Sequence, residues 1–208
     1  MIQPEEMQRL PSSFFLRSDV VKIARELLGK VLVTNFNNQY TSGRIVETEA
    51  YHGEIDRASH AYKGRTKRTE VIFGEGGKAY VYLCYGLHQM FNIVTSTKDE
   101  AHAILIRAVE PLDGIDIMLR RTGKSKLDNT LTRGPGNVGK AFGFNTSQCG
   151  LLIGSDELYI VDDGIKVEDD KIKTSPRIGV DYAGEHAQWP YRFYVHGSKY
   201  VSGKNSNK

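Results

Sequence analysis

The segment RIVETEAY (residues 44–51) alternates in polarity, and this alternation constrains the fold more than any other part of the chain. A period of two is that of a β-strand, so one strand face carries Ile45, Glu47, Glu49 and Tyr51. Two carboxylates beside an aromatic ring suit a site that stacks a planar group and then moves a proton or activates a water. A strand face open to solvent is the alternative, and this segment alone leaves both readings open.

Strand patterns recur along the chain and helical patterns interrupt them irregularly. Segments rich in Val, Ile, Tyr and Thr predict strands over residues 30–34, 41–51, 78–85, 92–96, 103–109 and 191–195. Helices are predicted over residues 18–28, where Ser18 or Asp19 caps and Gly29 ends the helix, and over residues 113–122 and 136–141. Asp163-Gly164 between short apolar alternations predicts a hairpin over residues 157–167. The order favours an α+β fold, and no glycine-rich nucleotide motif follows a strand.

Length and composition favour one compact unit. A chain of 208 residues with 39% hydrophobic content predicts a single domain over residues 1–208, with an ordered core over about residues 14–202 and a disordered tail over residues 203–208. Only two cysteines occur and no signal-like segment opens the chain, which favours a reducing, cytoplasmic location. Cys84 is expected in the core. The six histidines show no metal-ligand spacing, so we expect no catalytic metal and no cofactor.

Charge is distributed unevenly although the formal net charge is only +3. One acid, Asp128, occurs between residues 118 and 140 among the basic residues Arg120, Arg121, Lys124, Lys126, Arg133 and Lys140. This run predicts a surface that contacts phosphates. An acidic run, which would face away from a polyanion, consists of Asp156, Glu157, Asp162, Asp163, Glu168, Asp169 and Asp170. Solvated loops are the alternative for both runs.

The segment AYVYLCYGLHQMFN (residues 79–92) places Tyr85 at the end of a predicted strand, immediately before Gly86. A bulky ring at a hairpin tip, with Leu87 beside it, can be pushed between stacked bases. A tyrosine that only covers a core edge is the alternative. The preceding loop, residues 63–78, contains Lys63, Arg65, Lys67, Arg68 and Lys78 among glycines, a composition that can follow a phosphate chain.

Arg107 interrupts the apolar segment AILIRAVEP (residues 103–111). A buried guanidinium without a partner is costly, so Glu49, Glu47 or Glu110 is expected beside it. The pair could serve structure alone or take part in chemistry.

Taken in order, these motifs resemble the alkyladenine DNA glycosylase family, also called the 3-methyladenine or methylpurine DNA glycosylases. The resemblance runs from about Phe14 to Ser202 and rests on IVETEAYHG (45–53), His60, the loop from Arg65 to Arg68, YVYLCYG (80–86), Asn92, IRAVEPLDG (106–114), RGPG (133–136), SPRIGVDYAG (175–184) and RFYVHGSKYVS (192–202). It implies one α+β domain on a strongly curved, mainly antiparallel sheet with flanking helices and no helix-hairpin-helix motif.

The resemblance also implies a role for individual residues. Glu49 matches the general base that activates a water, and Arg107 matches the arginine that helps to place that water. Tyr51, His60 and Tyr82 match the side chains that sandwich a flipped purine, Tyr85 matches the intercalating residue with Leu87 beside it, and Asn92 matches the residue that discriminates against the amino group of guanine. Arg65, Lys67, Arg68 and Arg133 are expected on the DNA backbone.

Three positions depart from the family pattern. Thr69 stands where asparagine is usual, Ile72 where methionine is usual, and Asn137 where lysine is common. The last removes a possible phosphate contact. None of the three belongs to the set that stacks the base or activates the water, so they affect DNA affinity more than the reaction.

The resemblance therefore implies a monomeric base-excision repair enzyme without cofactor that acts on double-stranded DNA containing damaged purines such as 3-methyladenine or hypoxanthine. Such an enzyme is cytoplasmic and nucleoid-associated in a bacterium, or nuclear in a eukaryote, and has no membrane partner. No lysine occurs in residues 47–62 or 80–92, which favours a hydrolase over a lyase that forms a Schiff base. The alternatives are a lesion-recognising DNA-binding protein that does not cut, and a small-molecule hydrolase or transferase.

Overall fold

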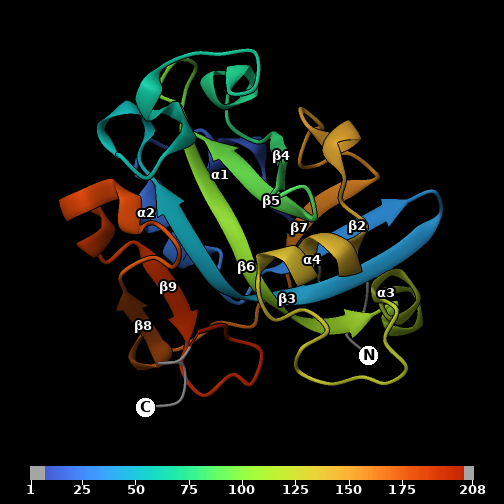
Figure 1. The fold of residues 1–208 in the computed structure, drawn as a ribbon. Helices are drawn as coiled ribbons and strands as arrows, with labels where there is room; N and C mark the ends of the chain where they lie inside the picture. Colours follow the sequence, from blue (N-terminus) through green and yellow to red (C-terminus); the bar gives the residue numbers. More distant parts are fainter. Residues whose placement is uncertain (1–7, 204–208) are drawn as a thin grey trace.

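The computed structural model describes residues 8–203, and a nine-stranded sheet runs through them (Figure 1). The strands are β1 (Gln8–Arg9), β2 (Val31–Phe36), β3 (Gln39–Tyr51), β4 (Ala79–Cys84), β5 (His88–Thr95), β6 (His102–Asp113), β7 (Leu158–Asp162), β8 (Ile172–Ser175) and β9 (Arg192–Val195). Their order is β1-β7-β2-β3-β6-β5-β4, and β9 joins β3 and β8. All strand pairs are antiparallel, which confirms the predicted α+β class. The predicted tail, apart from Gly203, lies outside the described residues.

The long strand β3 organises the sheet because it has different neighbours along its length. Its first half pairs with β2, its last residues pair with β9 through Glu47 and Glu49, and β6 lies along its other edge. The register between β3 and β6 shifts three times, so that Leu112, Val46 and Arg107 each lack a directly opposite residue. Such bulges bend a strand and redirect side chains. Figure 1 shows the resulting bend in β3. Glu47 lies between the last two register shifts, and Glu49 follows them.

Within residues 8–203, four α-helices accompany the sheet: α1 (Ser12–Phe15), α2 (Val20–Glu26), α3 (Ile115–Thr122) and α4 (Pro135–Phe142). The side chain of Asp19 accepts a hydrogen bond from the Lys22 amide (2.9 Å) and caps α2, as predicted. Helix α4 begins with a proline and ends at Gly143 in the left-handed region, the signals that normally bound a helix. Both helices bury apolar side chains in the main core.

Short 3₁₀ helices fill the connections and surround the site described below. They are η2 (Gly53–Ile55), η3 (His60–Lys63), η4 (Glu70–Phe73), η5 (Thr146–Gln148), η6 (Asp169–Lys171) and η7 (Asp181–Gln188). In Figure 1 the first three form the loops coloured teal above the end of β3, and η7 lies below them in orange. Within residues 8–203, no helix combines the length and the apolar character that crossing a bilayer requires.

The hairpin predicted around Asp163-Gly164 is wrong. Strand β7 ends at Asp162 and pairs with β1 and β2, while residues 165–167 are not in a strand. Gly164 does have a positive φ of 77°. Asp163, however, forms an ion pair with Arg44 (Nη2 to Oδ2, 2.7 Å) and does not connect two paired strands. The chain does turn at Gly164, but β7 pairs with β1 and β2, which are distant in sequence, and not with the residues that follow the turn.

Candidate active site

A cavity of about 400 Å³, here called the first cavity, opens where several separate segments meet. Strands β3, β4, β5 and β6 form its floor, the loops between residues 58 and 72 form one side, and residues 178–182 form another. The lining includes six of the predicted site residues, namely Tyr51, His60, Tyr82, Tyr85, Asn92 and Arg107, together with Arg68 from the predicted DNA-backbone set. The sequence motifs therefore converge on one place although they are up to 56 residues apart.

Glu49 lies directly behind the wall of this cavity and is fully buried. Its Oε2 accepts hydrogen bonds from the Tyr51 hydroxyl (2.9 Å) and from Arg107 Nη1 (3.0 Å), and its Oε1 accepts one from the Ile178 amide (2.7 Å). These three donor residues all line the cavity. A carboxylate has about four acceptor positions, so one position is left for a further donor such as a water.

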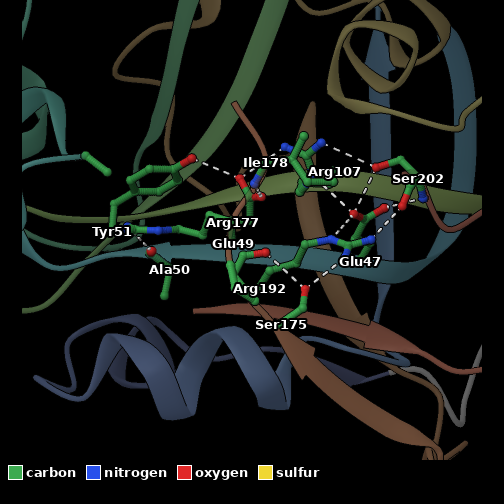
Figure 2. A network of polar contacts seen from close by, with 12 residues as sticks. Glu47, Glu49, Ala50, Tyr51, Arg107, Ser175, Arg177, Ile178, Arg192 and Ser202 are labelled. Carbon is green, nitrogen blue, oxygen red and sulfur yellow. Dashed lines mark hydrogen bonds and ion pairs between the residues drawn. The ribbon is translucent and has the colours of Figure 1, made fainter. Parts of the chain in front are cut away.

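Glu47 is equally buried, but its contacts leave no room for substrate. Its Oε1 accepts from Arg107 Nε (3.1 Å), Arg192 Nε (2.7 Å) and the Ser202 hydroxyl (2.9 Å), and its Oε2 accepts from the Ser202 amide (2.7 Å). Figure 2 shows this network around the carboxylate. Four donors satisfy the carboxylate, so Glu47 fixes β9 and the C-terminal segment to β3. The reading of this strand face as solvated is wrong for both glutamates.

Arg107 joins the two carboxylates (Figure 2). It lies at the third register shift of the β3–β6 pair, between Glu47 and Thr48, and is only 6% exposed. Burial acts against its charged form, but the neighbouring Glu49 and Glu47 outweigh burial and raise the pKa of the guanidinium. The expectation of a glutamate partner is confirmed, with both Glu47 and Glu49 in contact and Glu110 not among the contacts found in residues 8–203.

Three aromatic side chains form one wall of the first cavity. The rings of His60 and Tyr82 meet edge to face with centroids 4.6 Å apart, and His60 Nδ1 lies 2.9 Å from the Tyr80 hydroxyl. Burial, together with the charge of Arg68, lowers the pKa of His60 to about 4. His60 is therefore neutral near pH 7 and presents an uncharged ring to the cavity.

Tyr51 lines another part of the same cavity and stays protonated. Burial, and next the charge of Glu49, raises the pKa of its hydroxyl well above the usual value. The guanidinium of Arg177 lies over its ring, 4.8 Å from the centroid. Arg177 in turn forms a fully buried ion pair with Asp56 and donates to the Ala50 carbonyl (2.9 Å). The stack fixes both the Tyr51 ring and the neighbouring residue Ile178, and thus two of the three groups that hold Glu49.

Tyr85 occupies the tip of the β4–β5 turn and is 91% exposed, with a positive φ of 50°. A left-handed conformation is strained for a bulky residue, so the turn presents this ring outward at an energetic cost. Leu87 follows Gly86 on the same tip and is 79% exposed. Cys84, expected in the core, is only half-buried and lines the cavity mouth.

Asn92 is buried on the cavity floor. Its Nδ2 donates to the backbone carbonyls of Tyr80 (3.2 Å) and Met90 (3.3 Å), so the side chain is fixed by β4 and β5 rather than free to turn. The floor at this position therefore has a defined shape.

The basic loop residues differ from one another in their contacts. Arg65 is paired with both Glu70 and Asp99, whereas Arg68 lines the first cavity with its guanidinium over the Tyr82 ring (5.1 Å). Lys67 is exposed, and neither Lys67 nor the half-buried Arg133 has an ion-pair partner within residues 8–203. The pairing of Arg65 leaves less of its charge available to a phosphate than the sequence alone indicates.

Comparison with known proteins adds evidence from outside the chain. Residues 13–199 match the family model described as methylpurine-DNA glycosylase. The chain belongs to this family. It is 47% identical over 189 residues to a protein of Chlamydia abortus (90% of this chain, 98% of the relative) and 45% identical over 196 residues to one of Myxococcus xanthus (94% of each). It is 42% identical over 205 residues to one of Clostridium perfringens (94% and 100%), and all three carry the name "Putative 3-methyladenine DNA glycosylase".

Two of the family departures have a structural consequence here. Thr69 is buried, and its Oγ1 accepts from the Thr66 amide (2.8 Å), which closes the loop before η4. Ile72 is buried and lines the first cavity.

Within residues 8–203, no cluster of three or more His, Cys, Asp or Glu side chains could hold a metal ion. The expectation of a site without metal or cofactor stays a prediction for this methylpurine-DNA glycosylase family member.

Several residues of the site escape sequence reasoning. Ile178 acts through its backbone amide, which no side-chain pattern reveals, and Arg177 and Ser202 lie 128 and 153 residues from Glu49 in the chain. Tyr182 lines the cavity mouth, is 70% exposed and donates its hydroxyl to the Ala58 carbonyl (3.2 Å). The sequence feature that could have revealed Arg177 and Tyr182 is the segment SPRIGVDYAG (175–184), in which one arginine and one aromatic residue occur among mostly small residues.

Proposed function

We propose that this protein is a monofunctional DNA-3-methyladenine glycosylase that flips a damaged purine out of duplex DNA and hydrolyses its N-glycosidic bond. The observation that carries the proposal is the Glu49 carboxylate, which is held by Tyr51, Arg107 and Ile178 behind an aromatic cavity and keeps one acceptor position open. The family membership and the names of the relatives agree with it.

In the proposed reaction, the bond between C1′ of the sugar and the base nitrogen breaks while a water oxygen bonds to C1′. Positive charge develops on the sugar, and the carboxylate of Glu49 stabilises that charge and accepts the proton of the water. Arg107, which donates to Glu49, helps to position the water. The base takes the bonding electrons, so a positively charged base such as 3-methyladenine leaves as a neutral molecule. The products are the free base and an abasic site.

The neutral rings of Tyr51, His60 and Tyr82 give a flipped purine faces on which to stack. Tyr85 would fill the space left in the duplex, with Leu87 beside it, and Asn92 would exclude the 2-amino group of guanine. A volume of about 400 Å³ is of the size that small-molecule sites occupy. No lysine lines the first cavity among the described residues, which supports a hydrolase over a lyase.

One incubation tests the reaction. The protein is mixed with a duplex containing a single 3-methyladenine or hypoxanthine, and the free base and alkali-labile strand breaks are measured. We expect both products to form together, with breaks only after alkali. Binding of the lesion duplex without release of base would instead support a DNA-binding protein that does not cut. Neither binding nor base release with damaged and undamaged duplexes alike would support an enzyme acting on small molecules. Either of these two results would refute the proposal.

The wedge can be tested separately. Tyr85→Ala should reduce flipping, because nothing then keeps the extruded base from returning to the stack. A fluorescent base next to the lesion should report less unstacking. The matched control is Tyr62→Ala, since Tyr62 is also exposed but does not line the first cavity. Equal unstacking by Tyr85→Ala and wild type would assign the wedge to another residue, with Leu87 next in line.

A further inference from the structure

A second cavity, of about 440 Å³, lies on the other side of the β4–β5 turn and is called here the basic groove. Its lining comes from that turn, from the C-terminal end of α3 and from α4, and includes Leu87, His88, Arg121, Lys124, Asn137 and Lys140. Tyr85 lines the first cavity and Leu87 lines the basic groove, so the turn forms a ridge between them. Figure 1 shows α4 crossing in front of the sheet, with α3 beside it.

The groove carries positive charge that the protein neutralises only in part. None of its described lining residues is acidic. Arg121 donates to the Ala141 carbonyl (3.1 Å) and to Gln39 Oε1 (3.2 Å), and Lys140 donates to the Thr122 carbonyl (3.2 Å), all of which are neutral acceptors. Lys124 has an acidic neighbour, Asp128, at 3.8 Å. Burial and the nearby Arg120 lower the pKa of Arg121, as expected for a cation without a carboxylate partner.

Close packing fixes the walls of the groove. A side chain at Gly139 would place its Cβ 1.9 Å from the Gln89 carbonyl oxygen, and one at Gly136 would lie 2.8 Å from the His88 ring. Helix α4 therefore rests directly on β5 only because both positions are glycine. Asn137 and Lys140 are one turn apart on this helix and both line the groove, so Lys140 supplies positive charge on the same face as Asn137.

We propose that the basic groove binds the phosphate backbone of the undamaged strand, opposite the flipped nucleotide. This inference rests on the proposed function. The two backbones of a duplex lie on opposite sides of the base stack, so a ridge that enters the stack has one strand on each side. The first cavity receives the nucleotide from the damaged strand, and the groove across the ridge therefore faces the other strand. Several cations in a cleft without carboxylates suit a phosphodiester chain.

The test combines a charge-removing variant with neutral phosphates. Lys124→Gln/Lys140→Gln and wild type are titrated by fluorescence anisotropy with a duplex containing a stable abasic-site analogue, at 50 to 200 mM salt. Uncharged methylphosphonate linkages are placed either in the undamaged strand or in the strand with the analogue. Lys166→Gln/Lys173→Gln is the matched control, since both lysines are exposed and line neither cavity.

Two phosphate contacts contribute about 1.8 to the slope of log affinity against log salt. The factor by which affinity falls between about 50 and 200 mM salt should therefore be about tenfold smaller for the double variant than for wild type. Methylphosphonates in the undamaged strand should weaken wild type more than the double variant, which keeps only Arg121 of the three groove cations, and the control should behave as wild type. An unchanged salt slope, or coupling to linkages in the other strand, would overturn the inference. Failure of the wild type to release a damaged base would instead overturn the proposed function.

Discussion

Glu47 and Glu49 are two residues apart on β3, are both fully buried and share Arg107, yet their other contacts differ. Glu47 receives four hydrogen bonds, two of them from Ser202 and one from Arg192. Glu49 receives three, all from groups that line the first cavity. A saturated carboxylate can only hold structure, whereas an unsaturated one next to a cavity can still accept a proton. From this comparison we expect Glu47 to stabilise the fold and Glu49 to be the residue that takes part in the proposed reaction.

The largest effect should come from Glu49→Gln. The amide keeps the size of the side chain but cannot accept the proton of the attacking water, so single-turnover excision should fall by about 10²- to 10⁴-fold. Binding of lesion duplex should persist, and thermal stability should change little. Excision within threefold of wild type would make Glu47 the next candidate and reverse the comparison.

Glu47→Ala should act on stability instead. It leaves Arg107 and Arg192, both nearly buried, without a shared carboxylate, and breaking such a pair costs about 3–5 kcal/mol. Urea unfolding monitored by circular dichroism measures this loss. Glu47→Gln is a milder variant should the alanine variant fail to fold. Excision per folded molecule should stay within a few-fold of wild type, and a loss as large as that of Glu49→Gln would give Glu47 a direct role in the reaction.

A matched pair of hydroxyl deletions refines the comparison, since each removes one donor from one carboxylate. Tyr51→Phe keeps the ring but removes the hydrogen bond to Glu49, and should lower the excision rate about tenfold, the equivalent of about 1.4 kcal/mol. Lesion binding should be nearly unchanged. An unaltered rate would mean that Arg107 and Ile178 suffice to hold Glu49.

The partner of that pair is Ser202→Ala, which removes one hydrogen bond to Glu47 and the weaker one from Arg107 Nη2 (3.3 Å), and leaves the amide contact. The free energy of unfolding should fall by about 1 kcal/mol, while the excision rate stays the same. A slower reaction at equal stability would contradict the structural role of the Glu47 network.

How much of this difference is visible in the sequence depends on which atoms make the contacts. Alternation in residues 44–51 predicts that both glutamates share a strand face, and a charged residue in an apolar strand predicts a carboxylate beside Arg107. Tyr51 is a local donor to Glu49, but the other donors that separate Glu47 from Glu49 include Ser202 and the Ile178 amide, which come from the last quarter of the chain. The turn at Asp163-Gly164 illustrates the same limit, since its partner strand was set by β1 and β2.

The smallest effect concerns pH and the wall beside Glu49. Burial, with the charge of Arg68, lowers the pKa of His60 to about 4, against about 6.5 in an unfolded chain. Between these values the unfolded chain binds the proton and the folded protein does not, so stability decreases as the pH falls from about 6.5 towards 4. His60→Gln should remove this contribution. Unfolding free energies at pH 7.5 and pH 5.5 should therefore differ less in the variant than in wild type, while a steeper dependence in the variant would mean that folded His60 is protonated and that the cavity wall carries charge.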